Sequence, residues 1–183
     1  TQNQSSAASD VYKRQILTQL LVMALKGVPA FYLPALLASE NDIKSFSMTG
    51  QRRDLNREKF KLDNLVSVLN NPESNANKNI KYLGNAMDIR SKLEQFHPSS
   101  EMECLSKGRS DIVVIKRGKG PKSVFAIHNM TENKINYQLD DYDLPELIDN
   151  DFNMKDFLAS TKYNWKNISL DPFQVIWLGS LMK

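Results

Sequence analysis

Hydrophobic residues are densest between positions 16 and 38, and polar residues interrupt them. Lys26, together with the glycine and prolines that follow it, leaves no run of the roughly 20 apolar residues that a membrane helix needs, so no membrane partner is expected. Residues 16–25 instead predict a buried helix that stops at Gly27. Residues 28–33 then predict a short strand that is apolar on both faces, as in a parallel sheet covered by helices.

The next part of the chain has one polar stretch and two amphipathic stretches. Residues 39–60 predict a long polar loop at the carboxyl end of the strand, where α/β barrels carry their binding groups. Residues 62–70 predict a short helix, because their apolar positions fall on one helical face. Residues 74–96 predict a longer helix of the same kind, which His97-Pro98 ends.

Short apolar runs separated by turn residues follow. Residues 112–115 and 123–128 predict a hairpin around the turn Arg117-Gly-Lys-Gly-Pro121. Further strands are predicted at residues 134–139, 167–170 and 174–178. Such short, turn-punctuated strands are typical of a small antiparallel sheet or sandwich.

The fold class predicted is therefore α/β plus all-β. We assign residues 16–98 to an α/β portion and residues 99–183 to a β domain. Residues 1–15 are polar, lack amphipathic periodicity and begin without Met. They resemble translated sequencing-adapter read-through, and we expect them to be disordered and an artefact. They contain no apolar stretch typical of a secretory signal, and a cytoplasmic location is expected.

Composition narrows the function classes. The chain has 183 residues, 41% hydrophobic and 25% charged, which is ordinary for a globular protein. A net charge of +3 does not favour a dedicated nucleic-acid binder, so no nucleic-acid partner is expected. One cysteine excludes an internal disulfide framework. Two histidines and that cysteine are too few for an ordinary His/Cys zinc site, and no metal or cofactor is expected.

An arginine-rich segment carries the strongest candidate chemistry: Gln51-Arg52-Arg53-Asp54-Leu55-Asn56-Arg57-Glu58. Three arginines within six positions suit an anionic or polyhydroxyl ligand, because planar guanidinium groups match carboxylate, phosphate and vicinal hydroxyls. An exposed cluster of Arg–Asp–Glu ion pairs explains the same spacing. Four carboxylates belong to the same loop: Glu40, Asp42, Asp54 and Glu58. Glycoside chemistry needs two such groups flanking one bond, but loop caps and ion pairs account for them equally well.

The remaining chemically capable residues are interpreted as structural. They are the turn glycines Gly118 and Gly120, the histidines His97 and His128, the single Cys104, the tryptophans Trp165 and Trp177, and the acidic run Asp140-Asp-Tyr-Asp143. The glycines lack the spacing of a phosphate loop. The cysteine is expected to be a packing residue, the tryptophans to lie in the core rather than to form a sugar platform, and the acidic run to be a solvated turn.

Five segments carry a resemblance to a known family. Residues 27–32 (GVPAFY) resemble the eighth barrel strand of the alpha-amylase superfamily, glycoside hydrolase family 13. Residues 36–42 (LLASEND) and 49–59 (TGQRRDLNREK) resemble the sucrose phosphorylase subfamily, including its glucosylglycerate phosphorylase-like members. Residues 125–130 (FAIHNM) and 172–178 (PFQVIWL) resemble segments of that family's C-terminal β domain.

This resemblance implies a fold and an activity. The fold is the last part of a TIM (β/α)8 barrel followed by a small β domain. The activity is retaining transfer of glucose from an α-glucosidic donor to phosphate or a hydroxyl acceptor, without a cofactor. The catalytic carboxylates follow earlier barrel strands, so this chain is expected to be a C-terminal fragment that holds no catalytic residue and is inactive alone. Glu40 and Asp42 do not replace them.

One substrate-binding residue carries over from the family. The resemblance makes Arg53 the arginine that contacts the donor glucosyl unit and assists phosphate or acceptor binding. Asn56 and Arg57 also match and are assigned a loop-supporting role. Arg52 departs from the small or polar residue usual at its position, which bears on acceptor preference.

Two other functions remain open. The β half alone could be a non-catalytic module that binds carbohydrate or a protein partner, which requires an exposed aromatic platform. A weaker alternative is an RNA- or phosphate-binding domain that uses Arg52, Arg53, Arg57 and Lys59, with binding that falls steeply with salt. Because a lone strand at 28–33 would expose unpaired edges, we also expect the isolated chain to aggregate or fold only in part.

Overall fold

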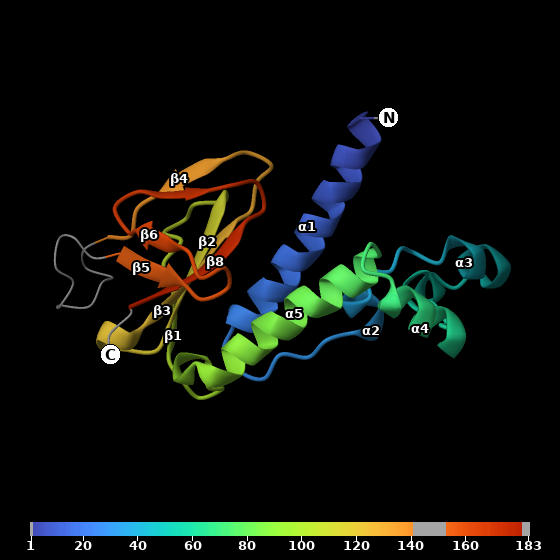
Figure 1. The fold of residues 1–183 in the computed structure, drawn as a ribbon, viewed down its shortest axis with the longest axis horizontal. Coiled ribbons are helices and arrows are strands. Elements are labelled where there is room, and N and C mark those ends of the chain that lie inside the picture. Colours follow the sequence, from blue (N-terminus) through green and yellow to red (C-terminus); the bar gives the residue numbers. More distant parts are fainter. Residues whose placement is uncertain (1, 141–152, 181–183) are drawn as a thin grey trace. The chain divides into compact units, whose positions relative to one another are not determined.

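The computed structural model describes residues 2–140 and 153–180, shown as a ribbon in Figure 1. The chain forms two compact units, described separately here. The sheet unit comprises residues 1–29 and 85–183, and the loop unit comprises residues 30–84. These units divide the chain at points other than the expected boundary near position 98. Residues 140–143, expected to form an acidic turn, extend into the part of the chain that is outside the description.

The sheet unit begins with helix α1, Gln2–Ala24. The predicted helix over 16–25 is present, but residues 2–15 continue it toward the N-terminus instead of forming the expected disordered tail. No Gly or Pro occurs before Gly27, so nothing in this stretch interrupts helix propagation. Arg14, within the supposed tail, lies 4.7 Å from the centroid of the Phe173 ring and 3.9 Å from a carboxylate oxygen of Glu132.

Two arginines from later in the chain donate hydrogen bonds to the carbonyls at the C-terminal end of α1. The last carbonyls of a helix have no partner within it and carry partial negative charge. Arg117 is fully buried, and its Nη1 donates to two carbonyls there at 3.0 and 2.6 Å. Arg90 donates from Nε and Nη2 to two more at 2.9 and 3.0 Å. The four accepting carbonyls belong to Met23, Ala24, Leu25 and Gly27. The helix end is thereby tied to residues 63 to 93 positions further along the chain.

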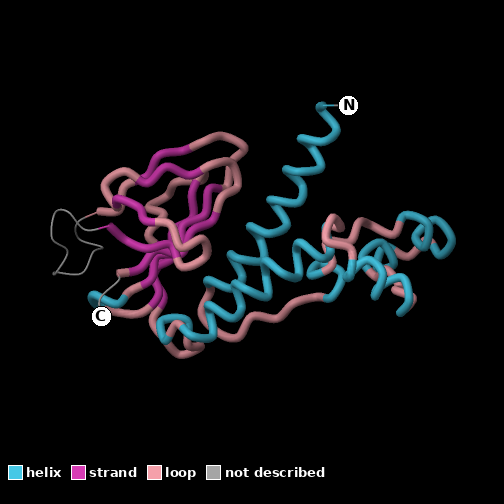
Figure 2. The backbone as a smooth tube through the Cα atoms, viewed as in Figure 1, coloured by secondary structure: helices cyan, strands magenta, loops and turns pink. Residues whose placement is uncertain are grey.

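The strands form one large and one small antiparallel sheet, which Figure 2 shows in magenta. The six-stranded sheet has the order β1-β2-β3-β8-β5-β6. Its strands are β1 Met102–Cys104, β2 Ile112–Arg117, β3 Val124–Asn129, β5 Asn153–Asp156, β6 Lys162–Asn164 and β8 Val175–Gly179. The two-stranded sheet pairs β4 Ile135–Tyr137 with β7 Ile168–Leu170. The predicted hairpin is the β2–β3 pair, in which Ile115 lies opposite Ala126, and η3, Gly120–Lys122, forms part of its turn.

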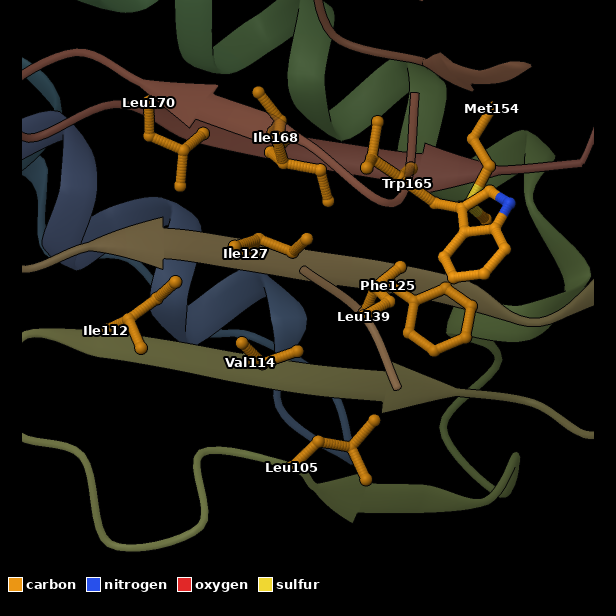
Figure 3. Packing of buried hydrophobic residues seen from close by; sticks show 12 residues of the cluster. Leu105, Ile112, Val114, Phe125, Ile127, Leu139, Met154, Trp165, Ile168 and Leu170 are labelled. Atoms are coloured by element: carbon orange, nitrogen blue, oxygen red, sulfur yellow. The ribbon is translucent and has the colours of Figure 1, made fainter. Parts of the chain in front are cut away.

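The core of the sheet unit lies on one face of β2, β3 and β8. Alternate residues of a strand point to the same face. In β3, Phe125 and Ile127 point toward the buried cluster drawn in Figure 3. The cluster comprises Leu105, Ile112, Val114, Phe125, Ile127, Leu139, Met154, Trp165, Ile168, Leu170, Ile176 and Leu178. The other face of β3 packs against α1, whose buried residues include Leu17, Leu20, Met23 and Ala24.

The strand predicted at residues 28–33 is absent, so that prediction is wrong. Residues 28–32 have no regular structure, and the short helix α2, Leu33–Leu36, follows. A strand needs a partner for its backbone groups. Among residues 2–140 and 153–180, no strand pairs with this segment.

The loop unit holds short helices. The stretch 39–60 is not a continuous loop as expected, because it contains α3, Ile43–Thr49, and the 3-10 helix η1, Arg52–Asn56. Helix α4, Leu62–Asn70, has the bounds that its apolar periodicity predicts.

The predicted helix over 74–96 is α5, Asn75–Lys92, followed by the 3-10 helix η2, Glu94–Phe96. Asn79, near the start of α5, is fully buried. Its Nδ2 donates to the carbonyls of Ala35 and Leu36 at 3.0 and 2.8 Å, which ties α5 to α2.

Candidate functional site

Helix α3 has a capping residue at each end, Asp42 and Gly50. Asp42 is its N-cap: the carboxylate accepts the Ser45 backbone N–H at 2.9 Å and the Ser45 hydroxyl at 2.5 Å. The hydrogen bond from the Ser45 hydroxyl lowers the pKa of the Asp42 carboxyl most, and the hydrogen bond from the Ser45 backbone N–H lowers it further. Gly50 ends the helix in the left-handed conformation, at φ 67°, with its N–H donating to the Phe46 carbonyl. A polar segment thus becomes a short helix through its caps.

The 3-10 helix η1 is joined to both ends of α3. At one end the Thr49 hydroxyl donates to Asp54 Oδ2 at 2.5 Å. At the other end the Asp42 backbone N–H donates to the Leu55 carbonyl at 2.8 Å. The two ties hold the residues that directly follow Arg53, so the backbone on which this arginine stands is fixed on its C-terminal side.

Arg53 itself is exposed. Among the residues that the structure describes, its guanidinium makes no hydrogen bond or ion pair. Arg52, Asn56 and Arg57 are exposed as well. The proposed Arg–Asp–Glu ion-pair cluster does not form here, since Asp54 bonds to Thr49 instead. Loop support from the side chains of Asn56 and Arg57 stays a prediction, because the contact that Arg57 makes comes from its backbone N–H, which donates to the Asp54 carbonyl at 3.4 Å.

The four loop carboxylates take different places. Asp42 and Asp54 have the capping and bracing partners given above. Glu40, Asp42 and Glu58 line one open hollow of about 600 Å³, together with Lys44 and Lys59. Asp54 is not part of its lining. The hollow therefore mixes acidic and basic side chains.

A second hollow was not anticipated from sequence. Its volume is about 380 Å³, and both apolar and polar residues line it. Its apolar residues are Leu37, Phe60, Leu65, Val68 and Ala76, and its polar residues include Ser39, Glu58 and Asn64. The amphipathic pattern of α4 indicated an apolar face. It gave no sign that residues 37 and 60, outside any predicted helix, would join that face.

The remaining candidates lie in the sheet unit. Trp165 and Trp177 are 4% and 0% exposed, so neither offers a ring to a sugar. Burial lowers the pKa of His128 to about 4, so its ring is neutral at pH 7. The expectation that Cys104 is a packing residue is wrong: it lies exposed on β1, and a hydrogen bond with Ser106 lowers its thiol pKa. In the described part of the chain, no three His, Cys, Asp or Glu residues gather as a metal site, and no helix is long and apolar enough to cross a membrane.

Solved structures with the same fold are enzymes of the alpha-amylase type. A trehalose-6-phosphate hydrolase of Bacillus licheniformis has a TM-score of 0.63 at 16% identity, covering 91% of this chain and 38% of that one. An Anoxybacillus alpha-amylase has a TM-score of 0.63 at 18% identity, covering 93% of this chain and 33% of that one. The fold class expected from the sequence is confirmed: the chain has the fold of part of a glycoside hydrolase family 13 barrel enzyme with its antiparallel sheet.

The curated relatives that match this chain share one name, glucosylglycerate phosphorylase. The glucosylglycerate phosphorylase of Allomeiothermus silvanus is 29% identical over 119 residues, which are 65% of this chain and 21% of that protein. The Escherichia coli glucosylglycerate phosphorylase is 21% identical over 165 residues, 90% of this chain and 28% of that protein. The chain thus spans about a quarter of these relatives' length. No family model matches it. The resemblance to family 13 and its phosphorylase-like members is confirmed.

Proposed function

We propose that this chain is part of a retaining enzyme that transfers an α-glucosyl group between a sugar donor and phosphate or a hydroxyl acceptor. Curated relatives named glucosylglycerate phosphorylase support this proposal, as does the alpha-amylase-type fold. The observation that carries it at the residue level is Arg53, a solvent-facing guanidinium on a backbone turn braced by α3. Arg53 binds the donor glucosyl unit and draws phosphate toward it.

The chemistry of arginine fits this role. Its guanidinium presents five donors in a planar fork, which matches paired sugar hydroxyls and two phosphate oxygens. It remains charged at every physiological pH. In the proposed reaction a carboxylate of the enzyme bonds to the anomeric carbon as the donor's glycosidic bond breaks, and the rest of the donor leaves with a proton from a second enzyme acid. A phosphate oxygen then displaces the carboxylate, and the proton of the phosphate returns to that acid. The acids of this reaction belong to barrel strands that precede residue 16 in the resemblance. The chain alone is then inactive, and the complete enzyme works on small molecules in cytoplasmic carbohydrate metabolism.

The test is Arg53→Ala in the complete protein that carries this chain. We expect kcat/KM for phosphorolysis of glucosylglycerate or sucrose to fall about 100-fold or more, as when one oriented donor is removed from a transition state. Arg53→Lys should recover little, because a lysine lacks the fork. The matched control is Arg109→Ala, which removes an exposed arginine of the sheet unit. Near-normal release of glucose 1-phosphate by the Arg53→Ala variant would refute the assignment.

The alternative, a carbohydrate-binding β module, depends on an exposed aromatic platform. Both tryptophans of the sheet unit are buried and do not supply one. A second test separates the alternatives: sugar binding to this chain should be lost on Arg53→Ala if the loop binds, and retained if the sheet unit binds.

A further inference from the structure

We propose that Thr49 is a positioning residue for Arg53, and that it acts by engaging the carboxylate of Asp54. This inference rests on the proposed function of Arg53. The Thr49 hydroxyl would then have two effects: it fixes the turn that carries Arg53, and it keeps the neighbouring anion from pairing with the guanidinium that must meet the substrate.

The geometry of the hydroxyl supports the first effect. Thr49 is the last residue of α3, and its Oγ1 lies 2.5 Å from Asp54 Oδ2 and 3.0 Å from the Ser45 carbonyl. A hydroxyl has one proton to donate, and the shorter contact to the charged acceptor is the stronger one. The same oxygen accepts the backbone N–H of Gln51 at 3.2 Å. One side chain therefore links the end of α3 to residues on both sides of Arg53.

A second hydrogen bond holds the other end of α3 to η1. The Asp42 N–H bonds to the Leu55 carbonyl, so α3 contacts η1 through both of its ends. Because α3 is capped by Asp42 and closed by Gly50, it serves as a short rigid brace for η1. Removal of the Thr49 contact leaves η1 held at Leu55 alone, and the turn at Arg53 gains freedom.

The charges support the second effect. Asp54 is adjacent in sequence to Arg53 and three residues from Arg57, positions from which a free carboxylate can form an ion pair. In the structure its Oδ2 is occupied by Thr49, and the Arg53 guanidinium has no partner among the described residues. Without the hydroxyl, Asp54 becomes a competitor for the arginine that the phosphate and the sugar need.

The experiment uses the complete protein that carries this chain. Thr49→Val removes the hydroxyl and keeps the shape, and it should lower kcat/KM for phosphorolysis about tenfold, on the scale of one lost charge-assisted hydrogen bond. Thr49→Ser should restore most of that loss. Ser47→Ala is the matched control, because the Ser47 hydroxyl donates to the Ile43 carbonyl within α3, and it should leave the kinetics unchanged.

Coupling distinguishes positioning from a general structural role. In an Arg53→Ala background, Thr49→Val should have no further effect, because the arginine that it serves is gone. Adding Asp54→Asn to Thr49→Val should recover part of the activity, since the amide no longer competes as an anion. Arginine side-chain NMR of the complete protein should show the Arg53 Nε–H more restrained in the parent than in the Thr49→Val variant.

Each outcome decides between the two proposals. If Arg53→Ala leaves turnover unchanged, the proposed function fails and this inference fails with it. If Arg53→Ala is damaging but Thr49→Val matches the parent, the positioning role alone is overturned. Equal losses from Thr49→Val in the parent and in the Arg53→Ala background also overturn it, because they indicate an effect that does not pass through Arg53.

Discussion

The sheet unit and the loop unit use their apolar residues differently. In the sheet unit, β3 is buried along its whole length and β8 likewise. In the loop unit, α3, η1 and α4 contain no buried residue. The buried residues of the loop unit are few: Leu37, Ala76, Asn77, Asn79 and Leu83. One unit is stabilised by its core, while the other is held in shape by caps and hydrogen bonds.

Helix α4 shows that an apolar helical face can remain exposed. Its sequence is amphipathic, yet Leu62 is 73% exposed and Val66 is 48% exposed. Apolar side chains gain about 25 cal/mol for each Å² that leaves water, and these side chains gain little of it here. An amphipathic pattern therefore specifies a helix and its apolar face, but the depth to which that face is buried depends on what packs against it.

The largest test of this contrast is a pair of truncations. Trp177 is fully buried, with its ring centroid 4.7 Å from that of Phe96, so Trp177→Ala should cost about 3–5 kcal/mol of unfolding free energy. Leu65 is only half-buried in α4, so Leu65→Ala should lower the unfolding free energy by less than about 1 kcal/mol. Urea denaturation of the chain followed by circular dichroism measures both. Equal costs would show that the two units do not differ in the way described.

A pair of glycines sharpens the contrast. A Cβ at Gly179 on β8 would overlap the ring of Phe157, so Gly179→Ala should destabilise the sheet unit by about 1–3 kcal/mol. A Cβ at Gly84 in α5 meets open space, and Gly84→Ala should stabilise the helix by roughly 0.5–1 kcal/mol. Denaturation midpoints provide the comparison. A neutral Gly179→Ala variant would contradict the close packing of β8.

The buried histidine gives the sheet unit a pH dependence. The folded pKa of His128 is about 4 because burial disfavours the charged ring, against 6.5 when unfolded. The unfolded chain binds the proton first, so stability is complete above pH 6.5 and falls by about 1.4 kcal/mol per pH unit toward pH 4. Burial raises the pKa of Asp156, which acts in the opposite direction, so the comparison must be between variants.

His128→Leu should flatten this slope between pH 6.5 and 5, and His97→Gln, at an exposed position, serves as the matched control. Denaturation of the three proteins at several pH values gives the slopes directly. If the slope persists in His128→Leu, another group is responsible for it.

The elements that sequence predicted well are those whose pattern is strong by itself. Helix α4 has the predicted bounds, and the β2–β3 hairpin follows from two apolar runs around a glycine turn. Strands β1, β5 and β6 were missed. They are three or four residues long, and their sequences MEC, NMKD and KYN carry no apolar alternation. They form because neighbouring strands offer backbone partners, which is information that a local pattern lacks.

In the candidate site too, the local sequence pattern was predictable and the contacts between separate segments were not. The spacing of arginines singled out the segment that holds Arg53, and the acidic residues around it were rightly open to interpretation as caps. The brace could not be predicted, because the contacts of Thr49 with Asp54 and of Asp42 with Leu55 depend on the path of the chain between them. The buried charge of Arg117 was not predicted either, since two of its partners are carbonyls 92 and 93 positions earlier in the chain.

The two arginines at the end of α1 set an order for assembly during synthesis. Carbonyls of residues 23–27 emerge from the ribosome long before Arg90, and Arg117 emerges later still. Until both have been made, the carbonyls at the end of α1 lack these hydrogen-bond donors. Docking of α1 on the sheet therefore belongs to the late stages of folding, and in a stalled nascent chain that ends before position 117 α1 should still be undocked.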